Sequence, residues 1–312
     1  MNKTWQDNSN IVHTGNLLLS KDGFDVIECD HCGLKHVIPL VDQSVQEEFY
    51  TEQFYQKEID HYIKSHQTDF EWWSIEHNEK FEFFEKHFGG TAQRKILDIG
   101  SGPGFFLKVA TERGWNAVGI EPGKPAFEFS KNNLHLTVFN EFFSRSNYSS
   151  FGIFNVVHLN NVLEHVVNPV DIVSMVKEIL VPNGLICISS PNDFNLLQQM
   201  AVEELGKDYW WVVPKHHINY FNLKSLKGIF SKIGFRTIFE STSFPLELFL
   251  FMGDDYIGNS SIGRTIHQRR MNLEKHFQKW DNNKLKRRIY NKFSEMGIGR
   301  ELTIIGSKQD NG

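Results

Sequence analysis

The chain has 312 residues, of which 40% are hydrophobic, and a formal net charge of −5. A chain of this size can bury one large domain with an accessory segment, but two equal domains are not expected. The acidic balance argues against general nucleic-acid binding, which usually needs a basic surface.

Membrane and secretory signals are not found in the sequence. No run of about eighteen apolar residues occurs, and Met1–Asn10 is polar, so we expect neither a membrane span nor a signal peptide. The three cysteines, Cys29, Cys32 and Cys187, cannot form a disulfide framework. We therefore expect a reduced, cytoplasmic protein.

Residues 1–43 form a first segment that is unlike the rest of the chain. Cys29 and Cys32 lie in a C-x-x-C-G knuckle between short β-like stretches. Two thiolates at this spacing can bind one zinc ion, but zinc needs two further ligands, and the nearby candidates are His13, His31 and His36. A zinc-loaded knuckle and a metal-free remnant both remain open, and either would have a structural or substrate-covering role.

Residues 44–90 are predicted to be helical and rich in aromatic rings, and Gly89 and Gly90 are predicted to end the helix. The simplest interpretation is an apolar face that packs over the edge of the main domain. The alternative is a lid in which some rings close over a bound ligand. The rings are Phe49, Tyr50, Phe54, Tyr55, Tyr62, Phe70, Trp72, Trp73, Phe81, Phe83, Phe84 and Phe88.

Residues 91–312 form the main domain, which begins with a strand at Lys95–Ile99 and a turn containing Gly100, Gly102 and Gly104. Such a turn lets a ligand approach the backbone closely. The dinucleotide fingerprint G-x-G-x-x-G is not met, because Phe105 occupies the place of its third glycine. Asp98 would repel a pyrophosphate but could hold an ammonium group, so a cationic nucleoside without phosphates fits better.

The next strands end in polar residues at the same predicted edge. A second strand, Asn116–Ile120, ends at Glu121 and Pro122, and Glu121 can accept bonds from both hydroxyls of a ribose. Leu134–Phe139 is a plausible third strand, and the residues after it, from Asn140 to Phe142, could contact an adenine. A fourth strand in residues 154–160 ends at Asn160 and Asn161.

The run Val162-Leu-Glu164-His165-Val166 follows this fourth strand. His165 could deprotonate an acceptor hydroxyl, since the ordinary pKa of histidine is close to neutral pH. The alternative is that Glu164 and His165 only brace the start of the next helix. Further along, residues 209–221 supply His216, His217 and Tyr220, which are candidates for a base or for acceptor binding, although a structural role is open for each histidine.

The remaining elements complete an alternating α/β pattern. Cys187 is expected in the core of the fifth strand, and 244–292 is expected to be an insertion with a basic, helical second part. Its charges fit a solvated helix face or a surface for an anionic or carrier-linked acceptor. The expected elements are a helix at Asp171–Leu180, a turn at 181–184, a strand at Leu185–Ser189, a helix at Leu223–Ile233, and strands at Arg236–Glu240 and Glu301–Ser307.

These motifs together resemble the class I S-adenosylmethionine-dependent methyltransferases, which have an acid followed by G-x-G-x-G after the first strand. The V-L-E-H-V run and the H-x-x-x-F segment are similar to the quinone and small-molecule O-methyltransferase branch. The resemblance implies a Rossmann-like, doubly wound seven-stranded sheet with an antiparallel last strand and S-adenosylmethionine as cofactor. The implied cofactor-binding residues are Asp98, Gly100, Ser101, Gly102, Gly104, Phe105, Glu121, Pro122, Asn140, Asn160 and Asn161, and the catalytic candidates are Glu164, His165, His217 and Tyr220.

The chain departs from these relatives in two places. The quinone enzymes carry an acid, associated with a divalent cation, where this chain has Asn161, and a neutral oxygen binds a hard cation less well. Related methyltransferases also carry an N-terminal zinc ribbon with two cysteine pairs, whereas this chain has only the second pair, Cys29 and Cys32. A required divalent cation is therefore not expected at Asn161.

The resemblance implies methyl transfer to a small-molecule acceptor. O-methylation of a sugar, nucleotide-sugar or secondary metabolite ranks above methylation of a quinone, and methylation at carbon or nitrogen remains open. A catalytically inactive scaffold that binds a partner is a second hypothesis, since fold alone does not exclude it. Nucleic-acid methylation ranks low, because no Asn-Pro-Pro-Tyr run is present. The sequence gives no indication of the oligomeric state.

Overall fold

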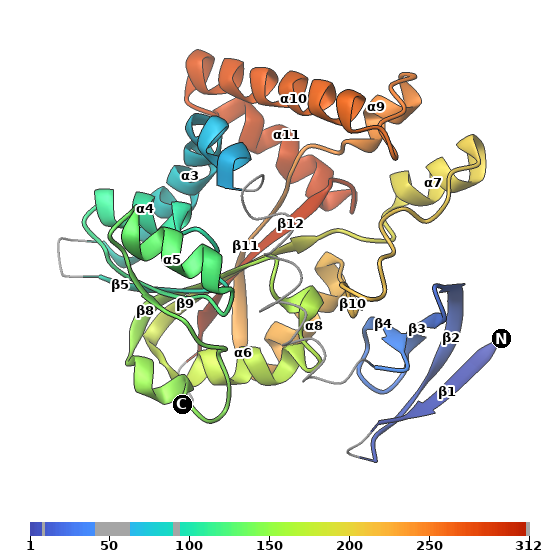
Figure 1. Cartoon of the computed structure of the whole chain (residues 1–312), viewed down its shortest axis with the longest axis horizontal. Coiled ribbons are helices and arrows are strands. Elements are labelled where there is room, and N and C mark those ends of the chain that lie inside the picture. Colours follow the sequence, from blue (N-terminus) through green and yellow to red (C-terminus); the bar gives the residue numbers. More distant parts are fainter. Residues whose placement is uncertain (8–9, 41–62, 90–93, 310–312) are drawn as a thin grey trace.

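The computed structural model contains a large twisted sheet covered by helices and a smaller sheet at the N-terminus (Figure 1). The structure describes residues 1–7, 10–40, 63–89 and 94–309. The expected helix between residues 44 and 62 lies outside these ranges. Among the described residues, no helix is long and apolar enough to cross a membrane.

The large sheet has seven strands in the order β11-β12-β9-β8-β5-β6-β7. Strands β5 to β9 pair in parallel, and β12 runs antiparallel to both β9 and β11. This confirms the expected Rossmann-like architecture. The strands are β5 (Lys95–Ile99), β6 (Asn116–Ile120), β7 (Thr137–Phe139), β8 (Phe154–Asn160), β9 (Leu180–Pro191), β11 (Phe235–Thr242) and β12 (Glu301–Lys308).

Both faces of this sheet are buried, because successive side chains of a strand point to opposite faces. On β5, Ile96 packs with residues of α3 (Phe70–Phe88) and α4 (Phe105–Glu112). Its neighbours Leu97 and Ile99 pack with residues of α6 (Pro169–Glu178) and α8 (Leu223–Ile233). The main domain also contains the helices α5 (Lys124–Asn132) and α7 (Leu196–Leu205). These layers hold the strand ends in a fixed arrangement.

Two details of the strands differ from the expected pattern. The turn expected at 181–184 is part of β9, where Asn183 has a φ of 56° and the pairing with β8 shifts register. The third strand, β7, is shorter than expected and begins at Thr137. Polar and glycine residues occur both in turns and at local irregularities inside long strands. The sequence of residues 181–184 therefore does not distinguish the two, which is why a turn was expected there.

The insertion forms three helices, α9 (Glu247–Phe251), α10 (Ser260–Asp281) and α11 (Lys284–Glu295). Its basic residues do not all form a solvated face. Arg264 forms an ion pair with the buried Asp69, and the buried Lys286 forms one with Glu79. The guanidinium of Arg270 lies 4.4 Å from the ring of Trp72. Some of the basic residues of the insertion therefore contact α3 and the residue before it, and hold the insertion against this helix.

The small sheet has the order β1-β2-β3-β4-β10. Its first four strands are β1 (Asn2–Gln6), β2 (Val12–Lys21), β3 (Phe24–Cys29) and β4 (Lys35–Ile38), and they come from the N-terminal segment. The fifth strand, β10 (Asn219–Tyr220), belongs to the main domain and pairs with β4. The N-terminal segment is thus joined to the main domain by strand pairing next to His217.

Candidate functional site

The glycine-rich turn connects β5 to α4 at the carboxyl end of the parallel strands. Gly100, Gly102 and Gly104 have φ values of 70°, 52° and 86°, which other residues adopt only with strain. Gly100 and Gly104 are also enclosed, since an added Cβ would lie 2.7 Å from Val162 Cγ2 and 2.6 Å from Leu136 Cδ1, respectively. These two glycines are therefore required for packing of the turn itself.

Gly102 differs from its neighbours because it faces open space. A Cβ built there meets no atom within 4 Å. Its backbone N–H donates a 2.7 Å hydrogen bond to Glu121 Oε2. The turn thus presents an uncovered backbone surface beside a carboxylate, which is the space that a ligand lying on the turn would need.

Glu121 follows β6 and joins two turns. Its Oε1 accepts a 2.7 Å hydrogen bond from the Gly123 N–H, while Oε2 accepts the bond from Gly102, and the residue is only 1% exposed. Asn140, after β7, donates bonds of 2.9 Å to the carbonyls of Glu121 and Pro122. The structure therefore brings together the glycine turn, the acid and the asparagine that the sequence analysis assigned to one site.

Aromatic residues lie over the start of α4. The ring of His66 stacks on Phe105 with centroids 5.9 Å apart, and Phe70 contacts the same ring at 5.6 Å. His66 also stacks on Trp73 of α3. Phe70 and Trp73, two of the aromatic rings of segment 44–90, thus lie near the start of α4, whereas Phe81 and Phe84 are fully buried core residues.

Asp98 lies in the interior of the fold. It is 3% exposed, and its Oδ1 is 2.7 Å from His158 Nδ1 on the neighbouring strand β8. Burial raises the pKa of Asp98 to about 8, with Lys80 acting in the opposite direction, and burial lowers the pKa of His158 well below its ordinary value. Burial thus shifts each of these two groups toward its neutral form.

Lys80 extends this interior group, and sequence reasoning missed it. Its Nζ lies 3.4 Å from His158 Nε2, 3.1 Å from Ser189 Oγ and 3.3 Å from Glu76. The signal that could have identified the group is register, because Asp98 and His158 are direct partners in the parallel pair of β5 and β8. The alternation of apolar residues alone does not reveal such a pair.

Asn160 ends β8, and Asn161 has a φ of 54° and donates its N–H to the Ser189 carbonyl at 2.9 Å. The next residues form a short 3-10 helix, Leu163–His165. Here Glu164 is 1% exposed and accepts a 3.0 Å bond from Ser190 Oγ. Burial raises the pKa of Glu164 to about 7.

His165 is held in a defined orientation. Its Nδ1 lies 2.9 Å from the His216 carbonyl, which can only accept, so Nδ1 carries the proton and Nε2 carries the lone pair. Nε2 lies 3.9 Å from Glu164 Oε1, and the ring of His217 lies 4.9 Å away. Burial lowers the pKa of His165 to about 4, so the ring is neutral at neutral pH. Nε2 therefore carries a lone pair that can accept a proton.

The structure brings Glu164, His165 and His217 together, with one ligand atom of each within 4.8 Å of the others. Tyr220 is placed differently. It is 1% exposed and belongs to an apolar cluster with Phe194 and Trp211. The ring centroid of Phe194 lies 5.5 Å from that of Tyr220 and 5.6 Å from that of Trp211. These contacts favour a structural role for Tyr220.

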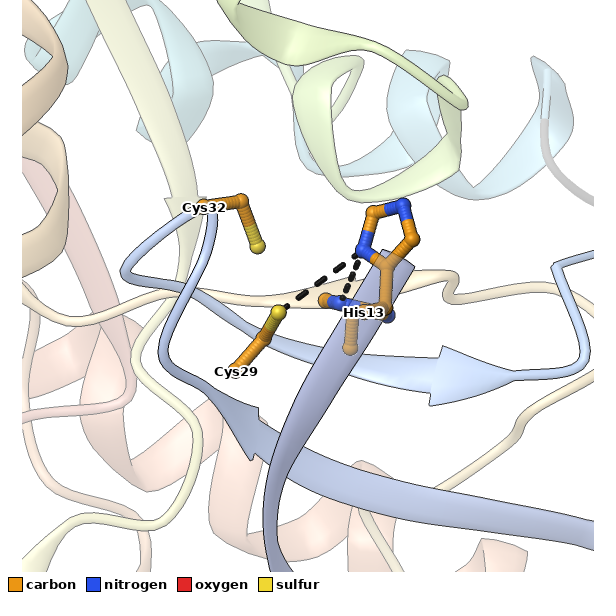
Figure 2. Close-up of side chains that lie close together, drawn as sticks. His13, Cys29 and Cys32 are labelled. Carbon is orange, nitrogen blue, oxygen red and sulfur yellow. Dashed lines mark hydrogen bonds between the residues drawn. The ribbon is translucent and has the colours of Figure 1, made fainter. Parts of the chain in front are cut away.

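Cys29 and Cys32 lie in the small sheet, remote in sequence from the glycine turn. Figure 2 shows both sulfur atoms turned toward the ring of His13. With His36 they form a group whose ligand atoms all lie within 4.8 Å of one another. His31, the third candidate of the sequence analysis, is exposed and not part of this group.

A comparison with protein families identifies the main domain. A family model described as a methyltransferase domain matches residues 66–239, which include the glycine turn, Glu121 and the Glu164–His165 pair. Among curated proteins, the ubiquinone biosynthesis O-methyltransferase of Histophilus somni is 25% identical over 142 residues, covering 42% of this chain and 58% of that protein. The enzyme of the same name from Pasteurella multocida is 24% identical over 177 residues, covering 49% and 71%. The chain thus matches little more than half of the first of these relatives.

Solved structures share the architecture. The plantazolicin methyltransferase BpumL, solved in complex with SAH, superposes with a TM-score of 0.51 at 14% identity and covers 85% of this chain and 95% of its own. At this identity the similarity establishes the fold, and the acceptor has to be inferred from the site.

Proposed function

The chain belongs to the methyltransferase-domain family, and we propose that it transfers the methyl group of S-adenosylmethionine to a hydroxyl group of a small molecule. The observation that carries this proposal is the orientation of His165. Its Nδ1 is bonded to the His216 carbonyl, which places the lone pair on Nε2, the atom that would accept the proton of an acceptor hydroxyl.

The residues present at the glycine turn fit the cofactor. The open backbone surface at Gly102 would receive it, and the Glu121 carboxylate, which accepts bonds from Gly102 and Gly123, would also accept from the two ribose hydroxyls. Asn140 holds the backbone beside this carboxylate. We assign cofactor binding to this group, together with Ser101 and Phe105 of the same turn.

When bound, the cofactor would supply an activated methyl group on a positively charged sulfur. The contribution of the protein is orientation of the acceptor and removal of its proton. His165 accepts the proton at Nε2, and His217, whose pKa burial lowers to about 3, adds a neutral ring beside it.

Asp98 is assigned an indirect role. The hydrogen bond between Asp98 and His158 and the contact of Lys80 with His158 join β5, β8 and α3 next to the glycine turn. Such a residue acts by positioning the turn, and not by touching the cofactor.

The acceptor class that we propose is a sugar, nucleotide-sugar or secondary metabolite with a free hydroxyl. Support for oxygen as the methylated atom comes from His165 and from the names of the curated relatives, which are O-methyltransferases. A quinone-type phenol, which those names indicate for the relatives, is the alternative that the assay must include.

The test is an acceptor panel of sugars, nucleotide-sugars and phenols with labelled S-adenosylmethionine, in which the methylated atom is assigned by NMR. We expect His165→Ala to lower kcat by about 10²-fold or more while the cofactor Kd stays within about twofold. The matched control is His216→Ala, which keeps the backbone carbonyl that orients His165 and should retain most turnover. Full turnover in His165→Ala would refute the assigned base.

A further inference from the structure

The small sheet brings four metal-binding side chains from separate elements to one place. His13 comes from β2, Cys29 from the end of β3, Cys32 from the following turn, and His36 from β4. We propose that these residues hold one tetrahedral zinc ion, and that this ion fixes β4 as the support for β10 and the His217 segment.

The distances agree with a tetrahedral site. Zinc lies about 2.3 Å from a thiolate and about 2.0–2.1 Å from a histidine nitrogen, which places tetrahedral N···S pairs about 3.6 Å and N···N pairs about 3.3 Å apart. In the structure His13 Nδ1 is 3.7 Å from Cys29 Sγ and 3.2 Å from His36 Nε2. Two edges of the expected tetrahedron are thus already formed.

In each histidine, the ring nitrogen that faces away from the group has an oxygen partner that favours a proton on it. The lone pair is then on the ring nitrogen that faces the group. His36 Nδ1 lies 2.8 Å from the Val37 carbonyl, so it carries a proton and leaves the lone pair on Nε2. His13 Nε2 faces the carboxylate of Asp7 at 3.7 Å, which favours the proton on that side and the lone pair on Nδ1. Two lone pairs 3.2 Å apart then face each other beside a sulfur. A cation between them satisfies all of these atoms, and an orienting partner behind each ring is typical of zinc sites.

The surrounding structure suits a closed, structural site. His13, Cys29 and His36 are 8%, 2% and 2% exposed, and the turn between the cysteines is tight, with the Gly33 N–H bonded to the Cys29 carbonyl at 3.0 Å. Among the residues that the structure describes, the buried members of the apolar cluster at this end of the sheet are Ile27, Cys29 and Ile38. So small a core gains substantially from metal binding, because the binding free energy contributes to folding.

The zinc group connects to the candidate active site through backbone hydrogen bonds. His36 is the register partner of Asn219, and the Val37 N–H donates to the Ile218 carbonyl at 2.9 Å. The Ile218 N–H in turn donates to the Glu164 carbonyl at 2.7 Å. The proposed zinc ligand His36 is thus adjacent to Val37, which bonds Ile218, and Ile218 follows His217 and bonds Glu164. Loss of the ion should therefore make the segment that contains His217 and Ile218 more mobile.

The first experiment measures metal content by mass spectrometry in the purified full chain. We expect about one zinc per chain in the wild type, and at least about a tenfold lower content in Cys29→Ser. The matched control is His31→Ala, which removes an exposed histidine that neighbours the group but is outside it, and it should keep full occupancy. Zinc loss in His31→Ala, or a wild type that binds no zinc after reconstitution, would overturn the proposal.

A second measurement remains decisive if Cys29→Ser does not fold. Wild-type protein is stripped with a chelator and titrated with Co²⁺, and a thiolate-to-cobalt absorption band with tetrahedral visible bands is expected at one equivalent. Hydrogen exchange is then compared between stripped and zinc-loaded protein. We expect exchange at the Val37 and Ile218 amides to be about tenfold faster without metal, while the Gly102 amide, in the turn after β5 of the large sheet, is unchanged.

These outcomes are independent of methyl transfer. Absence of the cobalt bands would leave a metal-free histidine pair and refute the site. Cobalt bands with unchanged exchange at Val37 and Ile218 would refute the support of β10 by the ion. Neither result depends on the acceptor or on the assignment of His165.

Discussion

Gly102 offers a test in which the structure supplies its own control. An alanine at Gly102 would have a φ near 52° and its Cβ would meet nothing within 4 Å, and an alanine at Gly114 would have a φ near 81° with the same open surroundings. Both substitutions should therefore cost about 1 kcal/mol of stability from backbone strain alone. For a chain of this size that corresponds to a Tm lower by about 2–4 °C in each variant.

The two variants should differ only in cofactor binding. Gly102 lies on the turn beside Glu121, whereas Gly114 lies between α4 and the start of β6, at the amino end of the parallel strands. A methyl group at Gly102 would occupy the proposed cofactor space, so we expect S-adenosylmethionine affinity to fall by about tenfold or more, against less than about twofold for Gly114→Ala. Calorimetric titration and thermal unfolding measure both quantities. Equal affinities in the two variants would refute the assignment of the open space at Gly102.

Two further substitutions test the acids of the site. Glu121→Gln should weaken cofactor binding by about 10–100-fold, because a charge-assisted hydrogen bond contributes about 1.5–3 kcal/mol. The control Glu203→Gln, at an exposed position on α7, should bind normally; equal affinities would contradict the role of Glu121. Burial raises the pKa of Glu164 from its ordinary 4.5 to about 7, so its stability contribution is full below about pH 4.5 and lost as pH rises through about 7. Between about pH 5 and about pH 8 this loss of stability amounts to about 2.5 kcal/mol. Glu164→Gln should remove it, as measured by urea unfolding at the two pH values; an unchanged loss would show that this carboxyl is not the titrating group.

The sequence predicts the main sheet well because its signals are local. The apolar run Lys95–Ile99, the glycine turn and the polar strand ends each carry their own pattern, and the helix expected at Leu223–Ile233 has those bounds in the structure. Glu121 was placed at the turn from strand spacing alone, and its bonds to Gly102 and Gly123 agree with that placement.

The features that the sequence did not predict depend on contacts between distant segments. Asp98 was expected to face a ligand, and its partner His158 follows from the register of two strands that are separated by a long stretch of chain. The ion pair between Arg264 and Asp69 likewise joins the insertion to the helix before the main domain. Neither pairing has a pattern within a single segment.

The same limit applies to the small sheet. Cys29 and Cys32 are recognisable from their spacing, but the choice of His13 and His36 over His31 depends on which strands pair. The addition of β10 to this sheet, which brings the N-terminal segment beside His217, has no signal in a strand of two residues.

The most direct test of the central claim is a calorimetric titration of S-adenosylmethionine, and of its demethylated product, into the purified chain. We predict binding of one equivalent of each with a Kd in the range of about 1 μM to 1 mM that is typical of enzyme ligands. Binding of both should be weakened in Gly102→Ala. If neither compound bound, the glycine turn and Glu121 would not form a cofactor site, and the chain would have to be regarded as a methyltransferase fold used as a binding scaffold.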